Sequence, residues 1–128
     1  MFLVSVLVIG VIAAATALSL LLLGWAAEQN GLVLEESSQA FEYAQTCAER
    51  AFLALRQDAA YAGGETMTFE RGTCRILPAG GSGNEDRFLC IEGESGQNTR
   101  RMELHIAKLL PMTTIEKWQE VAAFTLCL

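Results

Sequence analysis

The pattern of apolar and polar residues changes twice along the chain and divides it into three parts. Residues 1–27 contain no Asp, Glu, Lys, Arg or His. A helix of that length measures roughly 40 Å, more than the hydrocarbon core of a bilayer. Residues 28–62 are amphipathic, with apolar residues mostly three or four apart, and residues 63–128 alternate with a period of two. The pattern predicts an apolar helix, an amphipathic continuation of it and a set of strands.

The first two parts are predicted to form one helix over about residues 1–60. No proline occurs before Pro78. Gly31 is the one residue that favours a bend, because glycine costs roughly 1 kcal/mol relative to alanine inside a helix. Gly63 and Gly64 are expected to end the helix. The apolar stripe of its second half consists of Leu34, Phe41, Ala44, Ala48, Ala51 and Leu55.

The third part is predicted to be an antiparallel meander with strands at 65–70, 73–77, 86–92, 100–110 and 113–124. Short turns make consecutive strands antiparallel neighbours. Alternation predicts outward positions at Arg101, Glu103 and His105. The inward positions are Met67, Phe69, Cys74, Ile76, Met102, Leu104, Ile106, Ile115, Val121 and Ala123. The amphipathic half of the helix is expected to cover the inward face, which gives an α+β fold.

Composition and motifs exclude several classes of function. The chain has nine basic and fifteen acidic residues and a net charge of −6, whereas phosphate binding requires clustered Lys and Arg. Nucleic acid is therefore not an expected partner. No phosphate-binding glycine loop, H-E-x-x-H or G-x-S-x-G motif occurs. The acids at Glu85, Asp86, Glu92 and Glu94 lack the alternation of a calcium loop. We expect no enzyme active site, metal or cofactor.

Four cysteines, Cys47, Cys74, Cys90 and Cys127, indicate disulfides. Zinc sites usually contain close cysteine pairs, and these cysteines are widely spaced. Pairing Cys47 with Cys74 would join the helix to the sheet, and pairing Cys90 with Cys127 would hold the C-terminal tail. We favour this scheme. The alternative, Cys74 with Cys90 and Cys47 with Cys127, would link the tail to the helix.

Three interpretations compete for the apolar stretch 1–27. A cleavable signal sequence has a basic start and a shorter apolar run. A single-pass anchor fits the length but normally carries Lys or Arg on its cytoplasmic side. The third is a mature chain that begins at Met1 after removal of a leader, with a helix that packs against copies of itself through small residues. The predicted packing residues are Phe2, Val6, Gly10, Ala13, Ala14, Ala17 and Leu21.

The uncharged start, its amphipathic continuation and a sheet closed by cysteines resemble a mature type IV pilin. The segments Cys47-Ala48-Glu49, Gly72-Thr73-Cys74 and Trp118-Gln119-Glu120-Val121 also resemble small bacterial pilin-like proteins. The resemblance implies export through the inner membrane and processing by a prepilin peptidase, with N-methylation at Met1. It further implies assembly with identical subunits, by the pilus machinery, into a helical surface filament for adhesion, attachment or twitching motility.

Two positions depart from the family pattern. Ser5 stands where a glutamate is usual, which favours a minor or tip subunit or assembly by apolar packing alone. Leu22 stands where a proline is frequent, which favours a more continuous helix. Trp118, assigned to the outer face of the sheet, is a candidate contact with another subunit, although packing on a cross-strand neighbour explains it equally well. The competing function is a membrane-anchored extracytoplasmic binding or sensor module.

Overall fold

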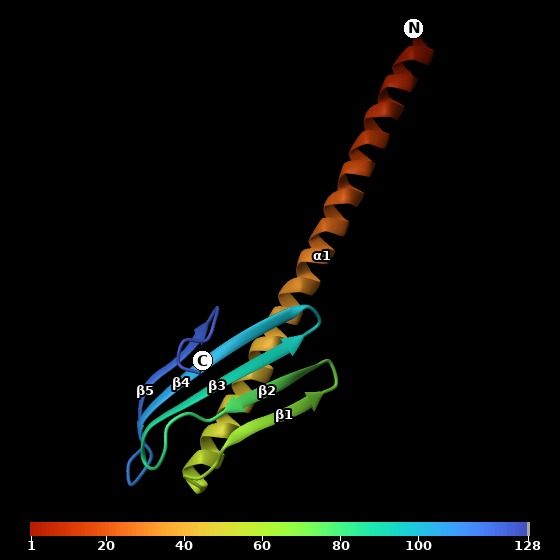
Figure 1. The fold of residues 1–128 in the computed structure, drawn as a ribbon. Helices are drawn as coiled ribbons and strands as arrows, with labels where there is room; N and C mark the ends of the chain where they lie inside the picture. Colours follow the sequence, from red (N-terminus) through yellow and green to blue (C-terminus); the bar gives the residue numbers. More distant parts are fainter. Residues whose placement is uncertain (128) are drawn as a thin grey trace. The chain divides into compact units, whose positions relative to one another are not determined.

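A computed structural model describes residues 1–127 and contains one helix and five strands over that range (Figure 1). Their bounds are α1 Phe2–Gln57, β1 Gly63–Phe69, β2 Gly72–Pro78, β3 Glu85–Ser95, β4 Asn98–Lys108 and β5 Thr114–Val121. The chain divides into two compact units, the N-terminal unit Met1–Leu34 and the head unit Glu35–Leu128.

The five strands form a single antiparallel sheet in the order β1-β2-β3-β4-β5. Each strand therefore pairs with its neighbour in the sequence, as short turns require. The predicted α+β fold with a long N-terminal helix and an antiparallel meander is confirmed. The helix continues through Gly31 without a break, although glycine favours a bend at this position.

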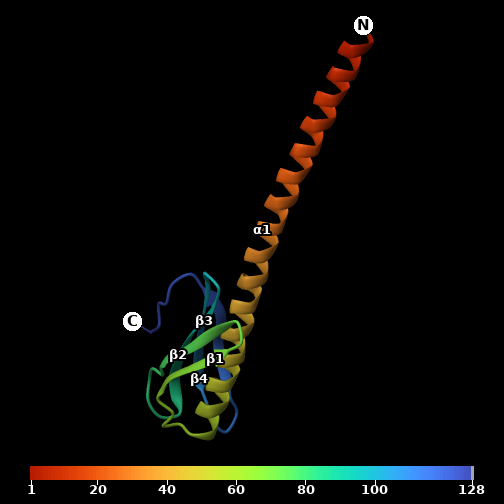
Figure 2. The same ribbon diagram turned by 90° about the vertical axis from the view of Figure 1, so that its right-hand side faces the viewer.

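Within the head unit, the second half of α1 covers one face of the sheet (Figures 1 and 2). Alanines form the middle of this contact, where Ala44, Ala48 and Ala51 are fully buried. Gly93 on β3 lies beneath them. A Cβ atom added at Gly93 would stand 2.2 Å from the carbonyl oxygen of Ala40. The alanine stripe therefore serves to bring the helix backbone onto the sheet.

The predicted faces hold for β4 but only in part for β5. Met102, Leu104 and Ile106 are buried toward the helix, as expected. Ile115 is opposite Ile106 and so lies on the helix-facing side, as expected, but it is 39 % exposed. Ala123 is also exposed and lies beyond the end of β5, and Val121 is only half-buried.

A β-bulge is the physical reason for the difference in β5. The register of β4 and β5 shifts between His105 and Ile106, and an extra residue in one strand reverses the alternation of its side chains. Trp118 is consequently opposite Leu104, on the helix-facing side of the sheet. The assignment of Trp118 to the outer face is therefore wrong.

The outer face of the sheet is partly covered by the chain that follows β5, which lies on the opposite side from the helix (Figure 2). Glu103 points to this face, as its alternation predicts, but it is fully buried rather than solvated. The tail covers it because Thr125 and Leu126 donate hydrogen bonds to its carboxylate. Alternation predicts the face of a residue, whereas its burial depends on segments distant in the sequence.

Substitution Gly93→Ala is expected to destabilise the head unit by about 1–3 kcal/mol, the usual cost of overpacking a tight contact. The added methyl group must displace the backbone of α1. Chemical denaturation of the full chain in detergent, followed by near-ultraviolet circular dichroism, measures the change. Thr99→Ala, at an exposed position of β4, is the control and should leave the midpoint nearly unchanged. Equal stability of both variants would contradict the close contact.

Candidate assembly surface

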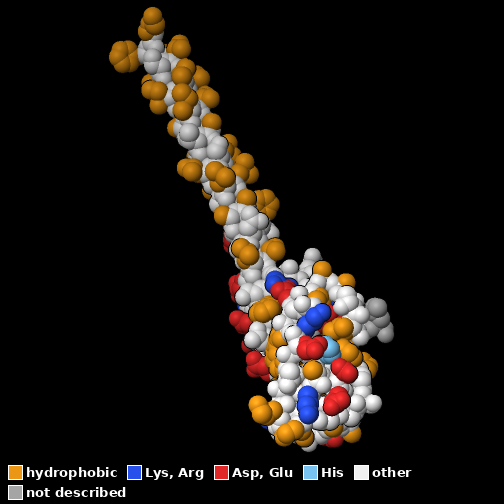
Figure 3. Space-filling view, turned by 90° about the vertical axis from the view of Figure 1, so that its left-hand side faces the viewer, with side chains coloured by type: hydrophobic (Ala, Val, Ile, Leu, Met, Phe, Trp, Pro, Cys, Tyr) orange, Lys and Arg blue, Asp and Glu red, His pale blue; other side chains and the backbone are white. Residues whose placement is uncertain are grey.

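The N-terminal unit consists of a helix segment whose side chains are all exposed. Every residue from Met1 to Leu34 is exposed, and only Glu28 among them is charged (Figure 3). Apolar surface in water is unfavourable by about 25 cal/mol per Å². Continuous exposed apolar surface of this extent marks a site of interaction with a membrane or another protein. This surface is the candidate functional site of the molecule.

By length and composition alone, α1 contains a stretch apolar enough to cross a membrane. Its most apolar window has a mean hydropathy of 2.8 and none of that window is buried. A secretory signal sequence would meet the same criterion. The helix therefore agrees with both a membrane anchor and a packing element, and the distinction depends on its faces.

The predicted packing residues share one face of the helix. At about 100° per residue, the seven positions from Phe2 to Leu21 fall within an arc of about 120°. Four of them are small, namely Gly10, Ala13, Ala14 and Ala17. All are exposed, and a Cβ atom added at Gly10 would meet nothing within 4 Å. The face is thus open to another helix, and its packing against one stays a prediction.

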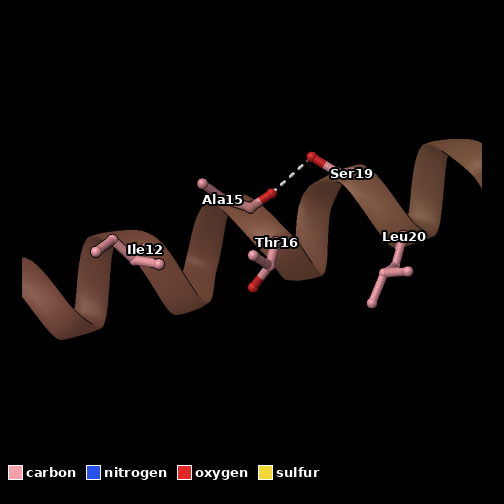
Figure 4. Close-up of a pocket in the computed structure, with 5 residues that line it drawn as sticks. All are labelled: Ile12, Ala15, Thr16, Ser19 and Leu20. Atoms are coloured by element: carbon pink, nitrogen blue, oxygen red, sulfur yellow. Dashed lines mark hydrogen bonds between the residues drawn. The ribbon is translucent and has the colours of Figure 1, made fainter.

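The hydroxyl groups of this unit are already satisfied within the helix. Ser5, Thr16 and Ser19 each donate to a backbone carbonyl three or four residues earlier, at 3.2, 2.9 and 2.9 Å. They need no partner from outside. A shallow hollow beside them is lined by one helix alone and is not an enclosed ligand site. Figure 4 shows the residues of the hollow: Ile12, Ala15, Thr16, Ser19 and Leu20.

Two disulfides hold the head unit together. Cys47 on α1 is bonded to Cys74 on β2, with their Cα atoms 6.5 Å apart. Cys90 on β3 is bonded to Cys127 in the tail, with a Cα separation of 6.2 Å. The structure thus contains the pairing that joins helix to sheet and tail to sheet, which was the favoured of the two schemes.

Glu103 is the buried charge that anchors the tail. Its carboxylate accepts hydrogen bonds from the Thr125 hydroxyl at 3.0 Å, from the Leu126 amide at 3.0 Å and from the Thr125 amide. Burial by itself would raise the pKa of Glu103, but the hydrogen bonds from the tail favour the ionised form and the net pKa is lowered. The tail and the ionised carboxylate therefore stabilise each other.

His105 is more enclosed than the predicted surface histidine. Its side chain is 17 % exposed, and its Nδ1 and Nε2 atoms lie 2.8 Å from Glu116 and 3.4 Å from Asp86. The ring stacks on Phe88 with centroids 4.6 Å apart. Because the two carboxylates approach different ring nitrogens, they do not converge on one ion. Over residues 1–127, no group of three His, Cys, Asp or Glu side chains is arranged to hold a metal.

Trp118 packs inside its own chain. Its ring meets that of Phe52 on α1 edge to face, with centroids 6.1 Å apart. It remains 36 % exposed, so part of the ring is left at the surface. The aromatic partner of Trp118 is a helical residue and not the expected cross-strand neighbour, and sequence alternation alone could not identify it.

Comparisons with protein-family models, with curated proteins and with solved structures gave no match. A long apolar N-terminal helix, whose second half packs on an antiparallel sheet with disulfides, is compatible with a pilin-like fold. It is equally compatible with a membrane-anchored module.

The stability of the head unit is expected to depend on Glu103 at acidic pH. A carboxylate whose folded-state pKa is lowered contributes stability above its unfolded pKa, and this contribution is lost as pH falls through the folded value. For Glu103 the loss occurs below the ordinary value of 4.5. Glu103→Gln should lower the free energy of unfolding at pH 7, and its difference from the native chain should shrink below pH 4.5.

Denaturant titrations at a series of pH values measure this effect, with Glu94→Gln on the exposed side of β3 as the control. The free energy of unfolding of both variants still changes with pH, because the hydrogen bond from Arg100 also lowers the pKa of Glu120. A constant difference between Glu103→Gln and the native chain from pH 7 to pH 3 would refute the assignment.

Replacing Cys90 and Cys127 by serine should release the tail. The disulfide closes a loop with a sequence separation of 37 residues, for which chain entropy gives about 3–4 kcal/mol of stabilisation. The double variant should lose that much in a denaturant titration, and protease should cleave its tail first. Replacing Cys47 and Cys74 by serine is the matched comparison, since it removes the other disulfide and leaves the tail bonded to β3. A tail that stays protected without the disulfide would show that the contacts with Glu103 and Arg101 are enough to hold it.

Proposed function

We propose that this chain is a structural subunit of a helical surface filament of the type IV pilus kind, with no catalytic role. The observation that carries the proposal is the exposed, uncharged surface of residues 1–27 on a chain with a disulfide-tied α+β head. Such a surface is stable in a bilayer or in a bundle of its own kind. A subunit that moves from the membrane into a filament occupies both environments in turn.

The distribution of small residues supports packing against identical helices. Gly10, Ala17, Gly24 and Gly31 recur every seventh residue. A seven-residue repeat keeps one seam in contact with a neighbouring helix, and small side chains on it allow close approach of the backbones. A lipid anchor has no requirement for such a seam. A contact between copies that does not close on itself produces a fibre.

The proposal also implies where the subunit resides and how it is processed and assembled. It resides in the inner membrane through its apolar helix, is processed by a prepilin peptidase and is then assembled with identical subunits by pilus machinery. Head units would form the outer coat of the filament, where adhesion, attachment or twitching motility takes place. Disulfides agree with folding of the head in an oxidising compartment.

A membrane-anchored extracytoplasmic binding or sensor module is the second candidate. Ser5 favours it, because the residue lacks the carboxylate expected to meet the N-terminal amine of a neighbouring pilin subunit, and its hydroxyl bonds within its own helix. In that case the chain would stay in the membrane as isolated copies. The two candidates therefore differ in where the protein is found on the cell.

Electron microscopy of sheared surface material, with mass spectrometry of its protein, separates the two. Filaments that contain this chain as a stoichiometric component support the proposal. A matched strain that lacks the gene should lose the filaments or, for a minor subunit, shorten them or reduce their number. If the chain fractionates only with membranes and the filament population is unaltered by its deletion, the anchored module is the correct function.

The packing face predicts the outcome of a matched pair of substitutions. Ala17 lies on the predicted face and Ala15 lies about 160° away from it around the helix. Both are exposed, and leucine costs the same small loss of helix propensity at either position. Ala17→Leu should reduce filament yield at least about tenfold, because small residues set the distance between helices. The filament yield of Ala15→Leu should be closer to that of the native chain.

The yield is measured as subunit in the sheared fraction relative to subunit in the whole cell, which corrects for expression. Equal yields from the two variants would show that this face does not set the packing. A stronger defect in Ala15→Leu would place the seam on the other side of the helix.

A further inference from the structure

Arg87 is a buried charged side chain of the head unit for which the filament proposal has no use. It lies on β3 opposite Ile106, so it points to the helix-facing side of the sheet. Its exposed fraction is 3 %. The Arg87 guanidinium reaches two segments. One is the turn that follows α1, and the other is the loop between β2 and β3.

The guanidinium is held by backbone carbonyls. Its Nε donates to Gly80 at 3.0 Å, its Nη1 to Ala59 and to Gly83, and its Nη2 to Tyr61 at 3.3 Å. Four of its five N–H groups are thereby used, and the second N–H of Nη2 has no acceptor among residues 1–127. The carbonyls fix the position of the group and leave one donor for another partner.

The charge of Arg87 is not matched by a carboxylate in the part of the chain that the structure describes. Every ion pair between described residues involves a base other than Arg87. The nearest acid along the α1–β1 turn, Asp58, instead accepts from the amide of Ala60. Carbonyl dipoles compensate a buried cation only in part, and an uncompensated buried charge is costly.

A pocket of about 440 Å³ opens beside this guanidinium. It is lined by the turn 59–62, by most of the segment 78–83 and by Arg87. Its rim is exposed at Ala60, Ala62 and Ser82, while Arg87 is buried. Gly81 and Gly83 have positive φ values of 75° and 74°, a backbone conformation found in concavities that bind anions.

We propose that this pocket binds a carboxylate group, which would accept a hydrogen bond from Nη2 of Arg87 and complete the neutralisation of its charge. A single charge and a single remaining donor suit a monoanion. A phosphate close to two negative charges would need further cations, and Arg87 is the only basic residue that lines the pocket. The inference does not depend on filament assembly, since it concerns the head unit alone.

Alanine methyl groups in the pocket allow a direct test. The full chain, labelled with ¹³C at alanine methyl groups and held in detergent micelles, is titrated with sodium acetate and, separately, with sodium chloride at the same ionic strength. Acetate should cause saturable shifts at Ala60, Ala62 and Ala79, which line the pocket. Ala122, next to Arg101 on the outer face of the sheet, serves as the control and should not respond.

Arg87→Met should weaken acetate binding at least about tenfold, because the charge-assisted hydrogen bond is removed. Arg75→Met is the matched control, since Arg75 is a surface residue paired with Glu92. If Arg87→Met does not fold, the titration of the native chain still decides. No saturable response of the pocket alanines to acetate, or an equal response to chloride, overturns the proposal.

A second ligand identifies the source of the carboxylate. Acetate represents a free small acid, and N-acetylglutamate amide represents a glutamate side chain presented by a protein. Tighter binding of the blocked glutamate indicates an acidic side chain from a partner, and equal or weaker binding indicates a small-molecule acid. Failure of both to bind refutes the site and leaves the filament proposal unaffected, because the latter is tested on sheared filaments.

Discussion

The structure depends first on the need to remove the surface of an uncharged helix from water. Residues 1–34 are exposed throughout and carry one charge, and nothing in the N-terminal unit covers them. At about 25 cal/mol per Å², this surface requires a lipid or protein environment. The remainder of the chain does not share the requirement, since the head unit buries its own core against the second half of the helix. The first half of α1 thus needs a lipid or protein environment from outside the chain, whereas its second half packs on the sheet of the head unit.

The head unit is built around a close contact and two covalent ties. Alanine and glycine bring α1 onto the sheet at Gly93, and the disulfide from Cys47 to Cys74 fixes that contact. On the opposite face, Glu103 and the disulfide from Cys90 to Cys127 hold the tail. A small domain gains much from such ties because its core is limited. In the proposed filament subunit, these ties would keep the head folded while the helix moves from membrane to filament.

Arg87 and Glu103 are both buried, but different groups compensate their charges. Glu103 is satisfied by three donors from the tail, so its ionised form stabilises the fold. Arg87 is satisfied by carbonyls that fix its position but carry no full charge. The first therefore has a structural role that is complete within the chain. Arg87 leaves the site that we propose for a carboxylate. Glu103 thus contributes to the stability of the head unit, and Arg87 to its proposed binding of a ligand.

The sequence by itself determined the long helix, the number and order of the strands and the inward positions of Met102, Leu104 and Ile106. Those features follow from local periodicity, turn residues and the absence of proline, which are properties of neighbouring residues. Only the tertiary structure decided that Trp118 faces the helix, that Glu103 is buried and that Arg87 borders a pocket. A bulge between β4 and β5, a returning tail and a distant helix end produce these contacts. They depend on segments far apart in the chain, so no local pattern specifies them.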